Sequence, residues 1–290
     1  MSAKDSVIPF VFDRLPVRGA LVQLDNTWQR MQEGHDYPQP IAEILGHAAA
    51  ATALIAQSLK FDGSVTLQIS SEGPFGMLVM QCTDDLDIRG MTSARRIGDA
   101  DNFASLVGDA HCAVTVDAGA MERPYQGIVE ISPDSLAASL EHYFARSVQV
   151  PSLLKLESVP AHCGGILLQQ MAGTAIASAD DWRRLGFLIH TLCPADFADG
   201  ATPDLLHKLF AEDDVRVFTA RPLRFKCRCS QSRVEEVLRF LGERETRAAL
   251  EEQGKVEVTC EYCGRLRSFD TVDIARVFAG PAVEAPDILH

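Results

Sequence analysis

The stretch HDYPQPIAEILGHAAAATALIAQSLKFDG, residues 35–63, predicts the main helix of the fold. After Pro40 its alanine, leucine and isoleucine residues recur at helical spacing, and nearly every side of the helix is apolar. A helix without a polar face is poorly suited to a water-facing surface and belongs inside a domain. We therefore expect a long and largely buried helix here.

Six short β-rich segments follow this helix, each bounded by turn residues: 64–70, 76–82, 86–92, 111–117, 125–132 and 164–171. The first three are typical of an antiparallel meander. Between the last two, Ser132 is placed to cap a helix, with Pro133 at its first position and Asp134 in its first turn. Since strands and helices do not alternate strictly, the pattern predicts an α+β fold and not a doubly wound parallel sheet.

The length of 290 residues indicates more than one domain, and a hydrophobic content of 47 % is ordinary for a chain that builds a core. The sequence contains no apolar run of about 18 residues, so we expect no transmembrane helix. The N-terminal stretch MSAKDSVIPFVFDRLPVRG carries scattered charges, unlike a signal peptide. We therefore expect a cytoplasmic protein, in which paired cysteines more often bind metal or act in redox chemistry than form permanent disulfides.

The net charge is −13, and the acidic excess lies in residues 1–222, because residues 223–290 are nearly neutral. An acidic body argues against nucleic-acid binding, which needs a basic surface. It is compatible with a protein that stays dispersed even while it exposes apolar surface.

Residues 173–222 differ in character from the segments before them. They contain short helical pieces interrupted by proline and glycine, of which Ser178 can cap the first and Thr202 the second. Helices of about three turns are marginal in water, so these pieces depend on docking to a neighbouring surface. We interpret the segment as a linker that is folded only while docked. An ordinary two-helix connection in a stable core is the alternative, which the local sequence alone favours.

Two close cysteine pairs stand out near the C-terminus, in FKCRCS at 225–230 and CEYCG at 260–264. The residues between them predict a helix, a break at Gly242, a second helix and a strand. Structural zinc takes four tetrahedral ligands, and two pairs brought together by an intervening fold supply them. Gly264 suits the turn of a metal knuckle, because glycine lets the backbone amides point at sulfur.

The pattern therefore predicts one Zn²⁺ held by Cys227, Cys229, Cys260 and Cys263. A C-x-x-C oxidoreductase is a weaker interpretation of the second pair, since no thioredoxin-like βαβ pattern surrounds it. Each pair is also close enough to oxidise within itself, although a C-x-C bridge requires a bent backbone. Four basic residues beside the pairs either activate the thiols or only balance the charge of the site, and the spacing does not decide which: Lys226, Arg228, Arg265 and Arg267.

The remaining cysteines, Cys82, Cys112, Cys163 and Cys193, lie singly in apolar or β-rich contexts. We expect them to be small buried hydrophobic residues. His162 beside Cys163 does not indicate a nucleophile and base, because neighbours in an extended segment point to opposite faces. No phosphate-binding, dinucleotide-binding or nucleophile-elbow motif is present, so we do not expect an enzyme. A group of acidic residues is expected to form a solvated turn: Asp84, Asp85 and Asp87.

Taken together, the motifs resemble the Hsp33 family of bacterial redox-regulated chaperones over nearly the whole chain. The resemblance rests on the helix at 35–63, on RPYQGIVEIS and GGILLQQM, and on FKCRCS paired with CEYCG and the following FD. It departs from the usual family pattern at SQSR after the first pair, at Arg267 in GRLRSFD, and at SVQV in the middle of the chain. None of these departures touches a cysteine of the two pairs.

The resemblance implies an ATP-independent holdase that is inactive while reduced and zinc-bound. Oxidation would join Cys227 to Cys229 and Cys260 to Cys263, release the metal and unfold the C-terminal part, so that unfolded client proteins bind to exposed apolar surface. It also implies a homodimer when oxidised and a monomer when reduced, and no use of nucleotide, nucleic acid or membrane.

The resemblance implies three parts: an N-terminal core domain with an antiparallel sheet at 1–172 for client binding and dimerisation, a metastable helical linker at 173–222, and a small zinc-binding redox-switch domain at 223–290. This mechanism is physically sensible, because structural zinc supplies on the order of 10–16 kcal/mol to small domains whose total stability is about 5–15 kcal/mol. Disulfides within each pair close very short loops and cannot replace it. The alternative is a constitutive zinc-ribbon module that binds another macromolecule without redox switching.

Overall fold

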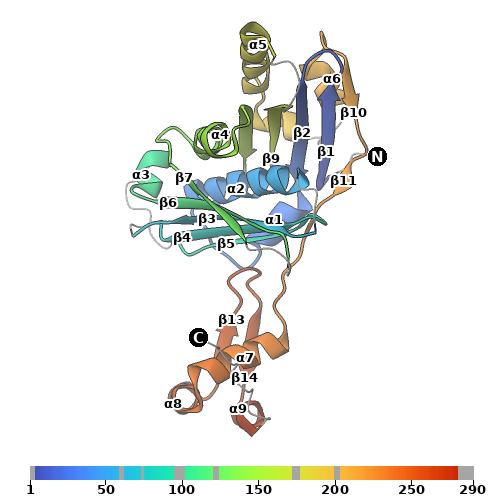
Figure 1. The fold of residues 1–290 in the computed structure, drawn as a ribbon. Coiled ribbons are helices and arrows are strands. Elements are labelled where there is room, and N and C mark those ends of the chain that lie inside the picture. Colours follow the sequence, from blue (N-terminus) through green and yellow to red (C-terminus); the bar gives the residue numbers. More distant parts are fainter. Residues whose placement is uncertain are drawn as a thin grey trace. The chain divides into compact units, whose positions relative to one another are not determined.

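The computed structural model describes residues 4–58, 62–72, 75–94, 102–119, 124–171, 177–198 and 203–279. The chain divides into two compact units, Met1–Lys226 and Cys227–His290. Helices and antiparallel sheets are mixed without strict alternation (Figure 1), so the predicted α+β class is confirmed.

The first sheet has the strand order β10, β1, β2, β9 and β8, with β11 also paired to β1, and its pairings are antiparallel. Its strands are β1 (Ser6–Phe12), β2 (Val17–Leu24), β8 (Ser152–Ser158), β9 (Cys163–Gln170), β10 (Val215–Val217) and β11 (Arg221–Pro222). The sequence analysis predicted β9 but assigned no strand to β1, β2 or β8. Most residues of β2 and β9 are buried whichever face they point to, so neither strand shows the alternation of a half-exposed strand.

The second sheet has the strand order β12, β5, β4, β3, β6 and β7. Its strands are β3 (Ser64–Ser70), β4 (Met77–Thr83), β5 (Asp87–Thr92), β6 (His111–Asp117), β7 (Tyr125–Val129) and β12 (Arg224–Phe225). The predicted meander of β3, β4 and β5 is confirmed, and β6 joins the sheet beside β3. The short strand β12 runs parallel to β5, whereas the other pairings are antiparallel.

Helix α2 (Gln39–Gln57) forms the centre of the first unit, packing against strands of both sheets (Figure 1). Its consecutive alanines Ala48–Ala51 are fully buried, and their small side chains let the strands approach closely. The predicted long buried helix is therefore confirmed. The other helices of this region are α1 (Asn26–Gln32), α3 (Phe103–Val107), α4 (Leu136–Tyr143) and the π-helical turn Phe144–Val148.

The predicted N-cap of α4 is wrong, because Ser132 was expected and Ser135 is observed. Ser135 is the N-cap, since its Oγ accepts a hydrogen bond from the amide of Ala138 at 3.1 Å. Ser132 instead forms a tight turn in which its Oγ accepts from the amide of Asp134 at 3.3 Å. Both serines suit a cap by type, and the position of the helix decides between them.

The described part of residues 173–222 contains α5 (Ala179–His190), a 3₁₀ turn at Pro194–Phe197, α6 (Pro203–Leu209) and the strands β10 and β11. Ser178 caps α5 as predicted, because its Oγ accepts from the amide of Asp181 at 3.0 Å. The predicted cap Thr202 lies outside the described residues. Arg184 of α5 also pairs with Asp213 through two hydrogen bonds of 2.8 and 2.7 Å, which ties α5 to the turn after α6.

These pieces share a second hydrophobic core with one face of the first sheet. The sheet contributes Ile8, Phe10, Phe12, Val17, Leu21, Ile166 and Leu168. The segment contributes Ala177, Leu185, Ile189, Leu192, Phe197, Leu206 and Phe210. Alternate residues of the same strands, such as Val7 and Leu167, face the main core around α2. The first sheet is therefore buried on both sides, and the described residues between 177 and 217, which we call the cover, pack on one of them.

The C-terminal unit contains α7 (Gln231–Leu241), α8 (Glu243–Gln253), the hairpin of β13 (Val256–Thr259) and β14 (Leu266–Phe269), and α9 (Thr271–Ala279). The predicted order of helix, Gly242 break, helix and strand is confirmed. Gly242 and Gly254 have positive φ angles of 97° and 73°, which suits glycine at the two helix ends. Within residues 227–279, the buried core of this unit consists of Val234, Leu238, Leu250, Phe269, Ile274 and Val277.

Within the described ranges, no helix combines the length and the apolar character that crossing a membrane requires.

A four-cysteine candidate metal centre

The fold of the C-terminal unit brings its two cysteine pairs together. Cys227 and Cys229 lie in the segment just before α7, while Cys260 and Cys263 lie in the turn between β13 and β14. The four Sγ atoms all lie within 4.8 Å of one another. We call these four residues the cysteine cluster.

The spacing of the sulfurs suits a tetrahedral metal ion. Cys227 Sγ lies 3.6 Å from Cys260 Sγ, and Cys229 Sγ lies 3.5 Å from Cys263 Sγ. A tetrahedral site with metal–sulfur bonds of about 2.3 Å has edges of roughly 3.8 Å. The four side chains are half-buried, so the site is enclosed but reachable from solvent. The cluster can therefore hold a metal ion, and its all-sulfur donor set is compatible with zinc.

Backbone geometry around the cluster is that of a metal knuckle. The amide of Gly264 donates to the carbonyl of Cys260 at 2.9 Å, and Gly264 has a φ angle of 64°. The amide of Cys260 in turn donates to the carbonyl of Arg265 at 3.0 Å. In the first pair, the amide of Cys229 donates to Cys227 Sγ at 3.4 Å. The glycine turn predicted from the sequence is present, and it aligns the second pair with the first.

The pKa values of two thiols in the cluster are shifted in opposite directions. Burial holds the pKa of Cys227 well above its ordinary value. Burial also acts to raise the pKa of Cys229, but hydrogen bonds from the other thiols and from Arg267 outweigh it and lower that pKa. Arg267 is held in place by a 3.0 Å hydrogen bond to Gln231 Oε1. Cys229 is therefore the thiol of the cluster whose pKa a neighbouring guanidinium helps to lower.

The other nearby cations are used differently. The Lys226 side chain pairs with Asp87 of the second sheet. The backbone amide of Arg265 hydrogen-bonds Cys263 and acts to lower the pKa of that thiol, although burial raises it overall. Of the basic residues in the sequence pattern, Arg267 thus interacts with the cluster through its side chain, whereas Lys226 serves another contact.

Of the four cysteines outside the cluster, three are buried and one is exposed. Cys82, Cys112 and Cys163 are buried, as predicted, and burial raises the pKa of each, that of Cys112 to about 12. Cys193 is exposed, so the prediction is wrong for this residue. It caps the 3₁₀ turn, where its amide and its thiol both donate to Asp196 Oδ2, at 2.9 and 3.2 Å.

Two further sequence-level expectations can be compared with the structure. His162 Nε2 contacts the carbonyl of Pro194 at 2.8 Å, which gives the ring a partner other than Cys163. The prediction of a solvated turn is wrong for Asp87, whose side chain is only 10 % exposed and pairs with Arg224 and Lys226. Sequence reasoning missed this contact because the partners lie 137 and 139 residues away.

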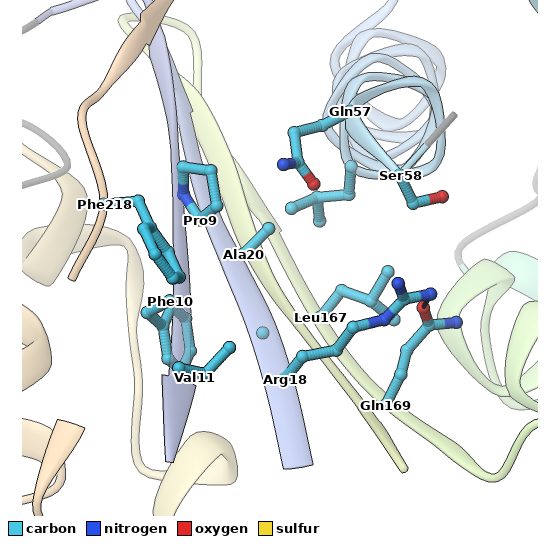
Figure 2. A pocket seen from close by; sticks show the side chains of 12 residues that line it. Pro9, Phe10, Val11, Arg18, Ala20, Gln57, Ser58, Leu167, Gln169 and Phe218 are labelled. Carbon is cyan, nitrogen blue, oxygen red and sulfur yellow. Dashed lines mark hydrogen bonds between the residues drawn. The ribbon is translucent and has the colours of Figure 1, made fainter. Parts of the chain in front are cut away.

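A hollow of about 240 Å³ lies on the first unit, beside the end of α2 (Figure 2). Its walls are mostly apolar, and Arg18 stands at one end with a 3.0 Å hydrogen bond to Gln169 Oε1. Phe218, which follows β10, lies at its edge and is 47 % exposed. The other described lining residues include Leu54, Gln57 and Ser58 of α2 and the turn that ends it.

Comparison with known proteins gives consistent results. A family model described as Hsp33 protein matches residues 5–270. The 33 kDa chaperonin of Nitrosococcus oceani is 37 % identical over 288 residues, covering 99 % of this chain and 98 % of that protein. The 33 kDa chaperonin of Methylobacillus flagellatus is 36 % identical over 295 residues, covering 100 % of both. The crystal structure of the 33 kDa chaperonin of Thermotoga maritima matches with a TM-score of 0.79 at 23 % identity, covering 95 % of this chain and 98 % of that one. This last likeness bears on the fold.

Proposed function

Because the chain belongs to the Hsp33 family of chaperones, we propose that it is an ATP-independent holdase switched by oxidation of its cysteine cluster. The curated relatives are named chaperonins, and the four sulfurs are grouped as a redox-sensitive metal site requires. The geometry of each unit supports the proposed steps of metal binding, oxidation and release of apolar surface.

In the reduced state we propose that Cys227, Cys229, Cys260 and Cys263 hold one Zn²⁺ per chain. The ion would supply a cross-link between the segment before α7 and the turn after β13, on the order of 10–16 kcal/mol of apparent folding free energy. Among its described residues, 227–279, the C-terminal unit has six buried hydrophobic residues in its core, and small domains have little stability of their own. Its fold therefore depends on the four thiolates staying together.

Oxidation removes the ligands. Each pair of thiolates gives up two electrons and forms one disulfide, while one hydrogen peroxide takes these electrons and two protons from solvent and becomes two waters. Hypochlorous acid serves equally, taking the two electrons and one proton and giving chloride and water. The proposed bridges join Cys227 to Cys229 and Cys260 to Cys263. Such short loops restrict the unfolded chain little, so the disulfides do not replace the lost cross-link.

In this proposal, unfolding uncovers the sheet side of the second hydrophobic core. Residues 177–217 lie on a sheet face that carries seven apolar side chains, three of them from β1: Ile8, Phe10 and Phe12. The same segment leads through β11 and β12 directly into Cys227. The proposal rests on one observation: the segment that covers an apolar sheet face comes just before the cysteine cluster in the chain. Once the cover leaves, this face is available to unfolded proteins.

The remaining features of the proposal follow the family. The N-terminal core, residues 1–172, would bind clients and form the dimer of the oxidised state, while the reduced protein is a monomer. Residues 173–222 act as the metastable linker and residues 223–290 as the zinc-binding switch. The protein would work in the cytoplasm, without nucleotide, nucleic acid or membrane, and without catalysing a reaction.

The proposal is tested by light scattering from a thermally unfolding client enzyme. Zinc-loaded reduced protein and peroxide-treated protein are compared at equal concentration, with Cys193→Ser as a control that lacks the exposed cysteine outside the cluster. We expect only the oxidised forms to suppress aggregation, and the control to behave like the parent. Equal suppression by reduced and oxidised protein would support a constitutive binding module instead.

A further inference from the structure

The last residues of the first unit form a short strap on the edge of the second sheet. Residues 223–226, which we call the strap, have the sequence LRFK and directly precede Cys227. The amide of Arg224 donates to the carbonyl of Leu86 at 3.2 Å, and that of Lys226 to the carbonyl of Ile88 at 3.0 Å. The strap therefore fills the hydrogen-bonding positions of the edge strand β5.

Two apolar side chains of the strap are inserted into the first unit. Leu223 is 3 % exposed and belongs to the main core. Its carbonyl accepts a hydrogen bond from Thr27 Oγ1 at 3.5 Å. Phe225 packs against the same core, and the guanidinium of Arg30 lies 5.8 Å from the centre of its ring. The edge of β5 thus offers one aliphatic site and one aromatic site lined by a cation.

The two basic side chains converge on a single carboxylate. Arg224 and Lys226 both form ion pairs with Asp87. The Asp87 side chain is 10 % exposed, whereas those of Arg224 and Lys226 are 67 % and 56 % exposed. The anion thus belongs to the sheet, and its cations come from the strap. If the strap leaves, Arg224 and Lys226 gain full hydration, while Asp87 keeps a site that selects a positive charge.

We propose that the β5 edge around Asp87 is a peptide-docking strand, which the strap occupies in the reduced protein and extended client segments occupy after oxidation. The matching client segment carries the order of the strap: an apolar residue, a basic residue, an aromatic residue and a basic residue. It adds to β5 as a strand, so that its amides replace those of Arg224 and Lys226 on the carbonyls of Leu86 and Ile88. This inference rests on the proposed function, and it adds a site distinct from the apolar face of the first sheet.

The probe is a fluorescent peptide of residues 221–226, RPLRFK, which contains the strap, and its binding to the full-length protein is followed by fluorescence anisotropy. We expect the oxidised protein to bind it at least about tenfold more tightly than the reduced protein, whose site is filled by its own strap. A control peptide in which glutamate replaces both the second arginine and the lysine should bind at least about tenfold more weakly, because it meets Asp87 with like charge. Equal binding of the two peptides would overturn the inference.

Two protein variants complete the test. Asp87→Asn in the oxidised protein should weaken peptide binding about tenfold, whereas Asp85→Asn, a matched change at an exposed residue of the same turn, should leave it unchanged. Equal loss in both variants, or no loss in either, contradicts a specific site at Asp87. The double variant Arg224→Glu/Lys226→Glu should bind the peptide already in the reduced, zinc-loaded state, because it lacks the ion pairs that hold the strap. If this variant does not bind the peptide, the inference is overturned by a protein in which Asp87 is unchanged.

Light scattering of the same oxidised samples separates this inference from the proposed function. If the oxidised protein prevents client aggregation but does not bind the peptide, only the docking strand at β5 is contradicted. If it neither prevents aggregation nor binds the peptide, the proposed holdase function fails, and this inference fails with it.

Discussion

Cys227 Sγ and Cys260 Sγ lie 3.6 Å apart although 33 residues separate them in the chain. Two helices and the strand β13 lie between them in the chain, and the two helices supply Val234, Leu238 and Leu250 to the core of the C-terminal unit. A ligand that holds these sulfurs together therefore holds that fold together. This contact, and the packing of residues 177–217 on the first sheet, lead to the tests of the cluster, the small core and the linker.

Loss of one cysteine should unfold the C-terminal unit and spare the main core around α2. In Cys227→Ser the site keeps three sulfurs, so we expect bound zinc to fall from one per chain toward zero and residues 227–279 to become sensitive to protease. The main core around α2 should stay resistant, because it does not include the cluster, whereas residues 177–217 should become more sensitive as they lose their docking. Zinc assay and limited proteolysis measure both effects. Cys193→Ser is the control, and a similar loss of zinc there would contradict the assignment.

Two residues of α7 provide a matched test of the small core. Leu238 is 1 % exposed, whereas Phe240 is 92 % exposed. Leu238→Ala should destabilise the reduced C-terminal unit by about 2–5 kcal/mol, since it leaves a cavity among few neighbours. Phe240→Ala should change its stability by no more than about 0.5 kcal/mol. Urea unfolding of the zinc-loaded protein gives both values, and equal effects would show that the core is placed wrongly.

Weakening the cover should activate the protein without an oxidant. Phe210 is 1 % exposed and its ring centre lies 5.8 Å from that of Phe10 and 4.9 Å from that of Phe12. Phe210→Ala should weaken docking of residues 177–217 by about 3–5 kcal/mol. We expect more binding of a hydrophobic dye and partial suppression of client aggregation by the reduced variant. Phe187→Ala, at a position 69 % exposed on α5, is the control.

If reduced Phe210→Ala behaves like the parent in both assays, the segment is an ordinary connection within a stable core. That result would favour the alternative raised from the sequence and would remove the linker from the switch.

Acidification should destabilise the first unit through His47. Burial and, secondarily, the charge of Lys155 lower the pKa of His47 to about 4. In the unfolded chain His47 binds a proton near pH 6.5, whereas in the folded chain it does so only near pH 4. The free energy of unfolding therefore falls as the pH drops from about 6.5 toward 4, by about 3 kcal/mol in total. Urea unfolding at pH 7.5 and 4.5 measures it, and His47→Gln should reduce the difference. An unchanged difference in the variant would assign the effect to other groups.

The parts of the fold that depend on local pattern were predictable. The apolar run of α2 and the alternation in β3, β4 and β6 show in the sequence because nearby residues produce them. Strands β1 and β2 escaped prediction because Pro9 and Gly19 interrupt them, and both residue types are atypical within strands. Gly19 is required by packing, since a Cβ there would lie 2.2 Å from the ring of Phe10.

The candidate site was predictable for a similar reason. Close pairs of cysteines imply a four-sulfur site wherever the intervening chain folds back, and the spacing of Cys227, Cys229, Cys260 and Cys263 shows this directly. The exposure of Cys193 and the pairing of Lys226 with Asp87 were not predictable, because each depends on which distant segment packs beside it. The identity of the metal and the disulfide pairing stay predictions.

The most direct test follows zinc and chaperone activity in one sample during stepwise oxidation. Released zinc is measured with a chromogenic chelator while light scattering reports suppression of client aggregation. The account predicts that the two rise together, with suppression absent while the four thiols are reduced and complete when about one zinc per chain has been released. Suppression that develops fully while the zinc stays bound would contradict it.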